Sequence, residues 1–372
     1  MKNIIHFSLA NTKSGITQYV LNNWKFIDKT RYQFHMATFG GKLDFQPKLE
    51  AEGCKIFYIK NRAEDNLEEF RNEVMEIFSD GYDAVHLHTS YWKSFELEML
   101  AKKAGVPRII IHSHNTAVYD DNGREEKERQ HYKLAEKLSA DVGTDFWACS
   151  QKAAKWLYTD KIPENKIVIM KNGVDADKFA YNDVVRNEYR SRLNWENKFI
   201  IGHIGRFSYQ KNHKFLLQVF HEINRINGNA RLLLIGKGPL ETEIRSMAAQ
   251  YGLSEKICFA GACEDVSCWL QAMDLFCLPS RFEGFPIAAV EAQAAGVPLI
   301  LGDAVTREVN LNRKVVYVPL EMERWIYEIQ LKMEHDLEEK LYQRKEGKQL
   351  IKQQGYDIRD SVRELERLYG HV

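Results

Sequence analysis

The chain has 372 residues, 44% of them hydrophobic and 28% charged, and its 52 Lys and Arg residues balance its 52 Asp and Glu residues. This length exceeds what one ordinary hydrophobic core uses and predicts two domains. A formal net charge of zero argues against a nucleic-acid partner, which would favour a basic excess. The six cysteines form no C-x-x-C pair, which predicts reduced thiols in a cytoplasmic protein.

Short β-prone segments alternate with helical stretches through the first half of the chain. The predicted strands are residues 4–8, 33–39, 55–59, 84–88, 108–112, 145–150 and 166–170. Helices are predicted at residues 95–103 and 124–138. This alternation indicates a doubly wound parallel sheet, in which ligands bind beyond the carboxyl ends of the strands.

Two of the predicted strands end in a His-x-His sequence, His86 with His88 and His112 with His114. Residues two apart share one face of a strand, so each pair can point to one place. One interpretation is a transition-metal site, and the other is hydrogen bonding within the crevice. No Cys or carboxylate lies at ligand spacing, and we therefore expect no metal site here.

The second half of the chain opens with a polar stretch, residues 175–197, which we interpret as a linker with a short helix at residues 184–193. A strand at residues 199–204 leads into a loop that holds Arg206 and Lys211. An Arg and a Lys beside a loop after a strand suit a diphosphate, because the guanidinium is a planar fork and the ammonium a compact charge. Two solvated cations are the alternative interpretation.

The stretch SRFEGFPIAAVEAQAAG, residues 280–296, lies between two short apolar runs that predict parallel strands. A helix is predicted at residues 287–295, ending at Gly296. Glu283 then lies in the loop before the helix, and Glu291 lies a turn inside it. The free N–H groups at the helix start favour an anion. By spacing alone, however, two such Glu residues indicate a solvated surface.

Three segments together resemble the signature of retaining GT-B-fold glycosyltransferases of family 4, of the bacterial capsular and exopolysaccharide type. They are Ser280–Pro286 with Glu291-Ala292 and Gly296–Pro298, Gly205-Arg206 with Lys211-Asn212, and Asn172-Gly173. The resemblance implies an α/β fold of two doubly wound, Rossmann-like domains facing a cleft. Residues 1–180 would form the acceptor-side domain, with the terminal helix 356–372 packing back on it. Residues 181–355 would bind the nucleotide-sugar.

The resemblance also assigns roles to individual residues. It implies that Arg206 and Lys211 hold the donor phosphates and that Glu291 holds the ribose. Glu283, beside the donor sugar, and His114, near the reacting sugar, are the implied catalytic residues. The remaining donor-binding residues would be Gly15, Gly284, Phe285, Pro286 and Ile287.

The implied function is transfer of a hexosyl unit from a nucleotide-diphospho-sugar to a sugar or lipid-linked sugar acceptor in surface polysaccharide synthesis. No cofactor and no metal are expected, and the chain would work in the cytoplasm, in peripheral contact with the inner face of the membrane. The alternatives are a non-catalytic, glycosyltransferase-like sugar-binding partner and a GT-B phosphorylase or nucleotide-sugar epimerase. The sequence leaves the sugar, the base, the linkage and the acceptor open.

Overall fold

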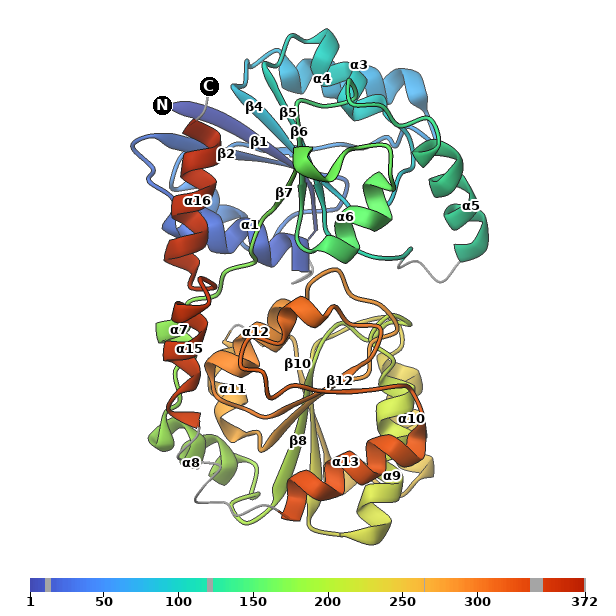
Figure 1. The fold of residues 1–372 in the computed structure, drawn as a ribbon, viewed down its shortest axis with the longest axis vertical. Helices are drawn as coiled ribbons and strands as arrows, with labels where there is room; N and C mark the ends of the chain where they lie inside the picture. Colours follow the sequence, from blue (N-terminus) through green and yellow to red (C-terminus); the bar gives the residue numbers. More distant parts are fainter. Residues whose placement is uncertain (11–14, 119–122, 264, 335–343, 371–372) are drawn as a thin grey trace. The chain divides into compact units, whose positions relative to one another are not determined.

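A computed structural model of the chain describes residues 1–10, 15–118, 123–263, 265–334 and 344–370 (Figure 1). The chain divides into two compact units. The first unit holds Met1–Gly173 and the residues from Ile358 onward, and the second unit holds Val174–Asp357. Each unit is built on its own parallel sheet, of seven and six strands respectively. These sheets confirm the predicted α/β class with two doubly wound, Rossmann-like units.

The sheet of the first unit has the order β3-β2-β1-β4-β5-β6-β7. Its strands are β1 Lys2–Leu9, β2 Tyr32–Thr38, β3 Ile56–Tyr58, β4 Ala84–Thr89, β5 Arg108–Ser113, β6 Asp145–Ala148 and β7 Ile167–Ile169. The central strands are short and buried along most of their length, as expected for a sheet covered on both faces. The strand order reverses between β1 and β4, where folds of this kind bind ligands.

Helices cover both faces of this sheet, with α1 and α16 on one side and α3 and α4 on the other (Figure 1). The helices are α1 Gly15–Phe26, α2 Gln46–Glu50, α3 Leu67–Phe78, α4 Glu96–Lys103, α5 Arg124–Ala135, α6 Gln151–Tyr158 and α16 Ile358–Gly370. Ser150 caps α6, because its side chain accepts a hydrogen bond from the backbone N–H of Ala153.

The last helix, α16, belongs to the first unit although it follows the whole second unit in sequence. Its apolar face is buried through Ile358, Val362 and Leu365. The Nζ of Lys2 donates to the carbonyl oxygen of Tyr369 at 3.0 Å, so the two ends of the described chain lie side by side (Figure 1).

The sheet of the second unit has the order β10-β9-β8-β11-β12-β13, and its strand order reverses between β8 and β11. The strands are β8 Phe199–Ile204, β9 Ala230–Ile235, β10 Ile257–Gly261, β11 Leu275–Leu278, β12 Leu299–Gly302 and β13 Val316–Val318. Strand β11, which leads into the segment around Glu283, is buried throughout. It lies at the centre of the sheet and places that segment where the strand order reverses, a position that we call the switch point.

Helices α9, α10 and α13 lie on one side of this sheet, and α8, α11, α12 and α15 lie on the other (Figure 1). The helices of the second unit are α7 Ala176–Phe179, α8 Asp183–Arg192, α9 His213–Ile226, α10 Glu241–Gln250, α11 Val266–Ala272, α12 Ile287–Ala294, α13 Met322–Glu334 and α15 Gly347–Gln353. Gly296 follows α12 with a φ of 65°, which is the left-handed conformation expected of a residue that ends a helix.

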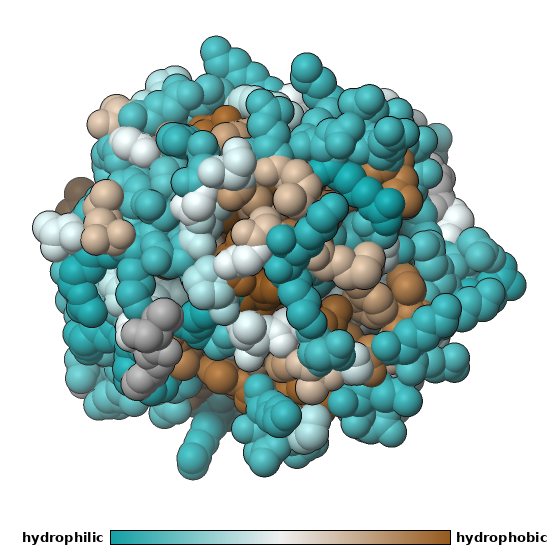
Figure 2. Space-filling model, turned by 90° about the horizontal axis from the view of Figure 1, so that it is seen from above, coloured by the Kyte–Doolittle hydropathy of each residue, from teal (hydrophilic) through white to brown (hydrophobic). Residues whose placement is uncertain are grey.

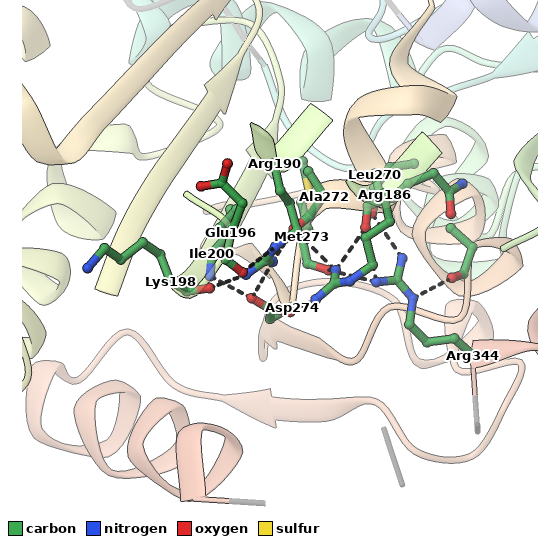
Figure 3. A network of polar contacts seen from close by, with 12 residues as sticks. Arg186, Arg190, Glu196, Lys198, Ile200, Leu270, Ala272, Met273, Asp274 and Arg344 are labelled. Atoms are coloured by element: carbon green, nitrogen blue, oxygen red, sulfur yellow. Dashed lines mark hydrogen bonds and ion pairs between the residues drawn. The ribbon is translucent and has the colours of Figure 1, made fainter. Parts of the chain in front are cut away.

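Residues 175–197, which we interpreted as a linker, instead pack into the second unit. The guanidinium groups of Arg186 and Arg190, on α8, lie 2.5 and 3.0 Å from the carboxylate of Asp274 (Figure 3). Arg344 joins the same region by donating to the carbonyl groups that end α11. Two charged residues of this stretch, Arg186 and Arg190, are therefore buried beside the sheet.

Hydrophilic residues cover most of the molecular face seen in Figure 2, and hydrophobic residues show mainly near its centre. Across the residues that the structure describes, no helix is both long and apolar enough to cross a membrane. All six cysteines lie in the described residues and are free.

Candidate functional site

The predicted donor-binding residues of the second unit lie at the carboxyl ends of β8 and β11, on either side of the switch point. Arg206 follows the end of β8 by two residues, and Glu283 follows the end of β11 by five. Because β8 and β11 are paired neighbours in the sheet, their loops meet at the same edge. The structure thus brings together two motifs that lie about 70 residues apart in sequence.

A close backbone contact shapes the loop that carries Arg206. A Cβ atom at Gly236 would lie 2.0 Å from the carbonyl oxygen of Gly205, and a Cβ at Gly238 would lie 2.4 Å from that of Phe207. The backbone N–H of Phe207 also donates to the carbonyl of Lys237 at 3.2 Å. The Gly-x-Gly pair after β9 is therefore needed for backbone packing against the loop after β8.

Lys211 and Glu283 join the two loops. The Nζ of Lys211 lies 2.6 Å from Oε1 of Glu283, and both side chains are largely buried, with 16% and 7% of their surface exposed. Gln210 adds a hydrogen bond from its side-chain amide to the carbonyl oxygen of Phe282 at 3.1 Å. The backbone N–H of Arg281 donates to the carbonyl of Gln210 at 2.8 Å. Sequence reasoning placed the cation on the donor phosphates and did not foresee its contact with Glu283.

The remaining donor-binding candidates surround the start of α12. Pro286 is the residue before the helix, Ile287 is its first residue, and both are buried. The ring of Phe285 stacks on Tyr356 with a centroid distance of 5.3 Å, which fixes the backbone beside Gly284. The first backbone N–H groups of α12 therefore have a fixed direction, and this suits an anion.

The charged candidates differ in exposure. Arg206 is exposed, and across the described ranges no carboxylate forms an ion pair with it. Glu291 lies inside α12 and is 7% exposed. An exposed guanidinium and a largely buried ammonium that faces a carboxylate can bind a phosphate group and a hydroxyl-bearing group.

Gly15 is the first residue of α1, beyond the carboxyl end of β1. No atom lies within 4 Å of the position that a Cβ at Gly15 would take, so packing in the described residues does not require a glycine there. The residue before it, Ser14, lies outside the described residues.

Histidines from three neighbouring strands meet on one face of the first sheet. His86 and His88 lie on β4 and His112 on β5, while His114 follows the end of β5. His6 on β1 completes the group, and sequence reasoning missed it. The signal that could have found His6 is its place in the first strand, because a doubly wound order sets β1 beside β4.

These histidines are buried, except for His114, which is partly exposed. Burial lowers the pKa of His114 to about 3, and burial together with His35 lowers that of His6 to about 3. The pKa values of the other three are lowered well below the ordinary value, first by burial and then by neighbouring imidazoles. The group is therefore neutral at pH 7.

Two Rossmann-like units, each built on its own parallel sheet, are the architecture of the GT-B fold. Residues 13–178 match the model for Glycosyltransferase Family 4, and residues 185–349 match the model for Glycosyl transferases group 1. The chain therefore combines a family 4 domain with a group 1 glycosyltransferase domain.

Several relatives are named as glycosyltransferases, and one of those below is named for capsular polysaccharide biosynthesis. The chain is 29% identical over 320 residues to EpsF of Bacillus subtilis, a candidate glycosyltransferase by name, covering 85% of this chain and 83% of that protein. It is 27% identical over 258 residues to an Escherichia coli UDP-Gal:α-D-GlcNAc-diphosphoundecaprenol α-1,3-galactosyltransferase, covering 67% of this chain and 63% of that protein. It is 23% identical over 299 residues to CapH of Staphylococcus aureus, a capsular polysaccharide biosynthesis glycosyltransferase, covering 78% and 79%.

Solved structures share the fold along the whole chain. Anabaena Alr3699/HepE in complex with UDP-glucose superposes with a TM-score of 0.80 at 16% identity, and both chains are fully covered. WaaG, a glycosyltransferase of lipopolysaccharide biosynthesis, superposes with a TM-score of 0.74 at 13% identity, again with full coverage of both chains.

Proposed function

We propose that the chain is a retaining glycosyltransferase that moves a hexosyl unit from a nucleotide-diphospho-sugar to a sugar or lipid-linked sugar acceptor in bacterial surface polysaccharide synthesis. The observation that carries the proposal is the 2.6 Å ion pair between Lys211 and Glu283, because it joins the cationic loop to the carboxylate loop. The polysaccharide roles in the names of the relatives support the pathway class.

The reaction breaks the bond between the sugar's anomeric carbon and the donor phosphate and forms a bond to an acceptor hydroxyl oxygen, whose proton passes to the departing diphosphate. Negative charge grows on the diphosphate as the bond breaks. Arg206 and Lys211 would stabilise this charge, together with the first N–H groups of α12. The ammonium of Lys211 has three donors, so it can hold Glu283 and a phosphate oxygen together.

The carboxylates and one imidazole would act on the sugars of the donor. Glu291 would accept hydrogen bonds from the ribose hydroxyls, and Glu283 would orient the transferred sugar. His114 would assist at the 6-position of that sugar or on the acceptor side, as a neutral donor and acceptor. Gly284, Phe285 and the other residues at the start of α12 would line the donor.

We propose that catalysis requires no metal ion, because the fixed cations Arg206 and Lys211 supply the charge that a divalent ion supplies in other phosphate chemistry. Transfer should then persist in excess EDTA. Restoration of a lost activity by added Mg²⁺ or Mn²⁺ would contradict this part of the proposal.

The name of the Escherichia coli relative gives a lipid-linked sugar as acceptor. We propose an acceptor of this class for the present chain, which would then work in the cytoplasm in peripheral contact with the inner face of the membrane. A flotation assay with vesicles that do or do not contain a diphosphoundecaprenol-linked sugar tests this. Equal recovery with both kinds of vesicle would exclude recognition of the lipid-linked sugar.

The first experiment is a thermal-shift screen of UDP-, GDP- and ADP-hexoses, because a ligand at about 100 times its Kd stabilises the folded state by about 2.7 kcal/mol. UDP-hexoses come first, since UDP-glucose and UDP-Gal appear in the names of similar proteins. The selected donor is then incubated with acceptor, and NMR determines the anomeric configuration of the product. Inversion would exclude the retaining reaction. Failure of every nucleotide-sugar to raise the melting temperature or to be hydrolysed would favour the non-catalytic alternative.

A further inference from the structure

The buried histidines of the first unit form two hydrogen-bonded runs. In the first, which we call the His114 run, Nδ1 of His6 lies 3.0 Å from Nε2 of His88, and Nδ1 of His88 lies 2.8 Å from Nε2 of His114. In the second, the His112 run, the hydroxyl of Tyr369 contacts Nδ1 of His86 at 2.7 Å, and Nε2 of His86 lies 3.1 Å from Nδ1 of His112. Only the first run ends at a partly exposed ring.

Strand register explains why these rings meet. His6 lies directly opposite His86 on the paired strands β1 and β4, and His88 lies directly opposite His112 on β4 and β5. Residues two apart on a strand share a face, so both histidines of each His-x-His sequence point to the same side. Tyr19 of α1 covers this side and contacts the ring of His114 at a centroid distance of 5.4 Å.

Hydrogen bonding couples the protonation of the three rings in the His114 run. A neutral imidazole has one N–H donor and one acceptor nitrogen. If His88 donates from Nδ1 to His114, its Nε2 must accept from Nδ1 of His6, and all three rings carry the proton on Nδ1. If His114 donates instead, all three rings carry the proton on Nε2. A mixed arrangement would place two donors or two acceptors against each other.

We propose that His6 and His88 are positioning residues that fix the ring orientation of His114 and couple its tautomer to their own, so that the three rings share one tautomer. The role of His114 in sugar transfer rests on the proposed function, whereas the tautomer coupling does not. A single tautomer gives the outer nitrogen of His114 one role, donor or acceptor, before a sugar arrives. Such pre-organisation avoids the cost of selecting the correct tautomer during the reaction.

The same rings satisfy the first geometric requirement of a metal site. Ligand atoms of His6, His86 and His88, and of His88, His112 and His114, lie within 4.8 Å of one another. Neither group includes a carboxylate or a thiolate, and Arg108 adds positive charge near His86. The imidazoles of both runs already pair with one another as hydrogen-bond donors and acceptors, which favours neutral rings over metal ligands.

The tautomers can be measured directly in the whole chain. Protein labelled with ¹⁵N-histidine gives separate Nδ1 and Nε2 shifts for each neutral ring, and single substitutions assign the signals among the 12 histidines. The expected result at pH 7 is one common tautomer for His6, His88 and His114. Opposite tautomers within this run would overturn the proposal. Stoichiometric metal in the purified protein, measured by mass spectrometry, would also overturn it.

Variants test whether the run supports catalysis. His88→Leu should lower kcat about tenfold at saturating substrates, roughly what one hydrogen bond contributes. His88→Asn should recover most of the loss, because an amide near the Nδ1 position can still bond to His114. The matched control is His86→Leu, a buried ring on the same strand in the His112 run, which should change kcat less than about threefold. Equal losses in His86→Leu and His88→Leu would contradict a positioning role.

The two proposals fail in different ways. If the wild-type chain transfers no sugar, the proposed function is wrong, and the NMR measurement still decides whether the tautomers are coupled. If the wild-type chain is active and His88→Leu leaves kcat unchanged while folded, the positioning role is wrong and the transferase assignment stands.

Discussion

The ammonium nitrogen of Lys211 lies 2.6 Å from a carboxylate oxygen of Glu283, which joins the loop after β8 to the loop after β11. Each side chain is largely buried, and its charge is balanced by that of the other. Replacing one therefore changes the electrostatic surroundings of the other, so the phosphate-binding role proposed for Lys211 and the sugar-orienting role proposed for Glu283 would be coupled through this contact.

The first prediction concerns the cations. Arg206→Ala and Lys211→Ala should each weaken UDP binding about 10- to 100-fold, because a hydrogen bond to a charged group contributes about 1.5–3 kcal/mol. Binding of uridine should change little, since it has no phosphate. Isothermal titration calorimetry measures both. Arg225→Ala, at the far end of α9 in an exposed ion pair, is the control and should bind UDP normally. Unchanged UDP affinity in both test variants would exclude the diphosphate assignment.

A second prediction separates the two carboxylates. Glu291→Gln should mainly raise the donor Kd, because the ribose is held equally in the ground and transition states. Glu283→Gln should mainly lower kcat, because the sugar it orients changes charge during the reaction. Steady-state kinetics with direct donor-binding measurements distinguish these effects. Identical kinetic changes in the two variants would show that the division of roles is wrong.

The third prediction compares the two histidines at the end of β5. His114→Ala should lower kcat at least about tenfold, which corresponds to one good hydrogen bond of about 1.4 kcal/mol. His112→Ala should keep most of the activity, because His112 is fully buried and its loss acts on packing. Turnover at saturating donor on folded variants is the measurement. An inactive His112 variant beside an active His114 variant would reverse the assignment.

The fourth prediction concerns acid stability. Burial lowers the pKa of His6 to about 3, with a further contribution from His35, whereas an unfolded histidine has a pKa of about 6.5. Between these values the unfolded chain binds the extra proton, so stability falls as pH falls from about 6.5 toward 3. One such group costs about 1.4 kcal/mol per pH unit, or about 2 kcal/mol between pH 7 and pH 5.

Urea unfolding of the wild type and of His6→Leu at pH 7 and pH 5 checks this. The loss of stability on acidification should be about 2 kcal/mol smaller in the variant. His114→Asn, at the partly exposed end of the run, is a second variant with the same expectation. An identical loss in the wild type and both variants would show that these rings titrate normally in the folded chain.

The fifth prediction concerns the buried charges beside β11. Burial raises the pKa of Asp274, but Arg186 and Arg190 outweigh burial and hold it below the usual value. Asp274→Asn leaves these two guanidinium groups without their carboxylate and should cost about 3–5 kcal/mol of unfolding free energy. The control is Glu188→Gln on α8, the helix that carries Arg186 and Arg190. This change removes the partner of Arg192 in an exposed ion pair and should cost less than about 1 kcal/mol of unfolding free energy. Equal urea midpoints for the two variants would refute this account.

Local pattern was enough to predict the strands and their carboxyl ends, because short buried runs alternate with helices along the chain. It also located the loops of Arg206 and Glu283, since sites in such sheets lie beyond the strand ends. It could not reveal the contact of Lys211 with Glu283, which depends on the pairing of β8 with β11. Pairing is a property of the whole sheet and leaves no local signal.

The dependence on strand pairing also explains why the sequence did not predict the contacts of His6 and Arg186. His6 lies in an ordinary apolar strand, and only the pairing of β1 with β4 brings it to His88. The stretch around Arg186 is rich in charge and therefore resembles a solvated linker. Its guanidinium group becomes a buried partner only because Asp274, directly before the central strand β11, lies beside it.

The position of α16 has a consequence for synthesis on the ribosome. The first unit lacks α16 until the whole of Val174–Asp357 has been translated. At about 5–20 residues per second, that interval lasts roughly ten to forty seconds. During this time the residues that bind α16, among them Arg108 and His86, have no partner from that helix. Until the second unit has been made, the growing chain therefore leaves exposed the part of its first unit that α16 covers, beside α1.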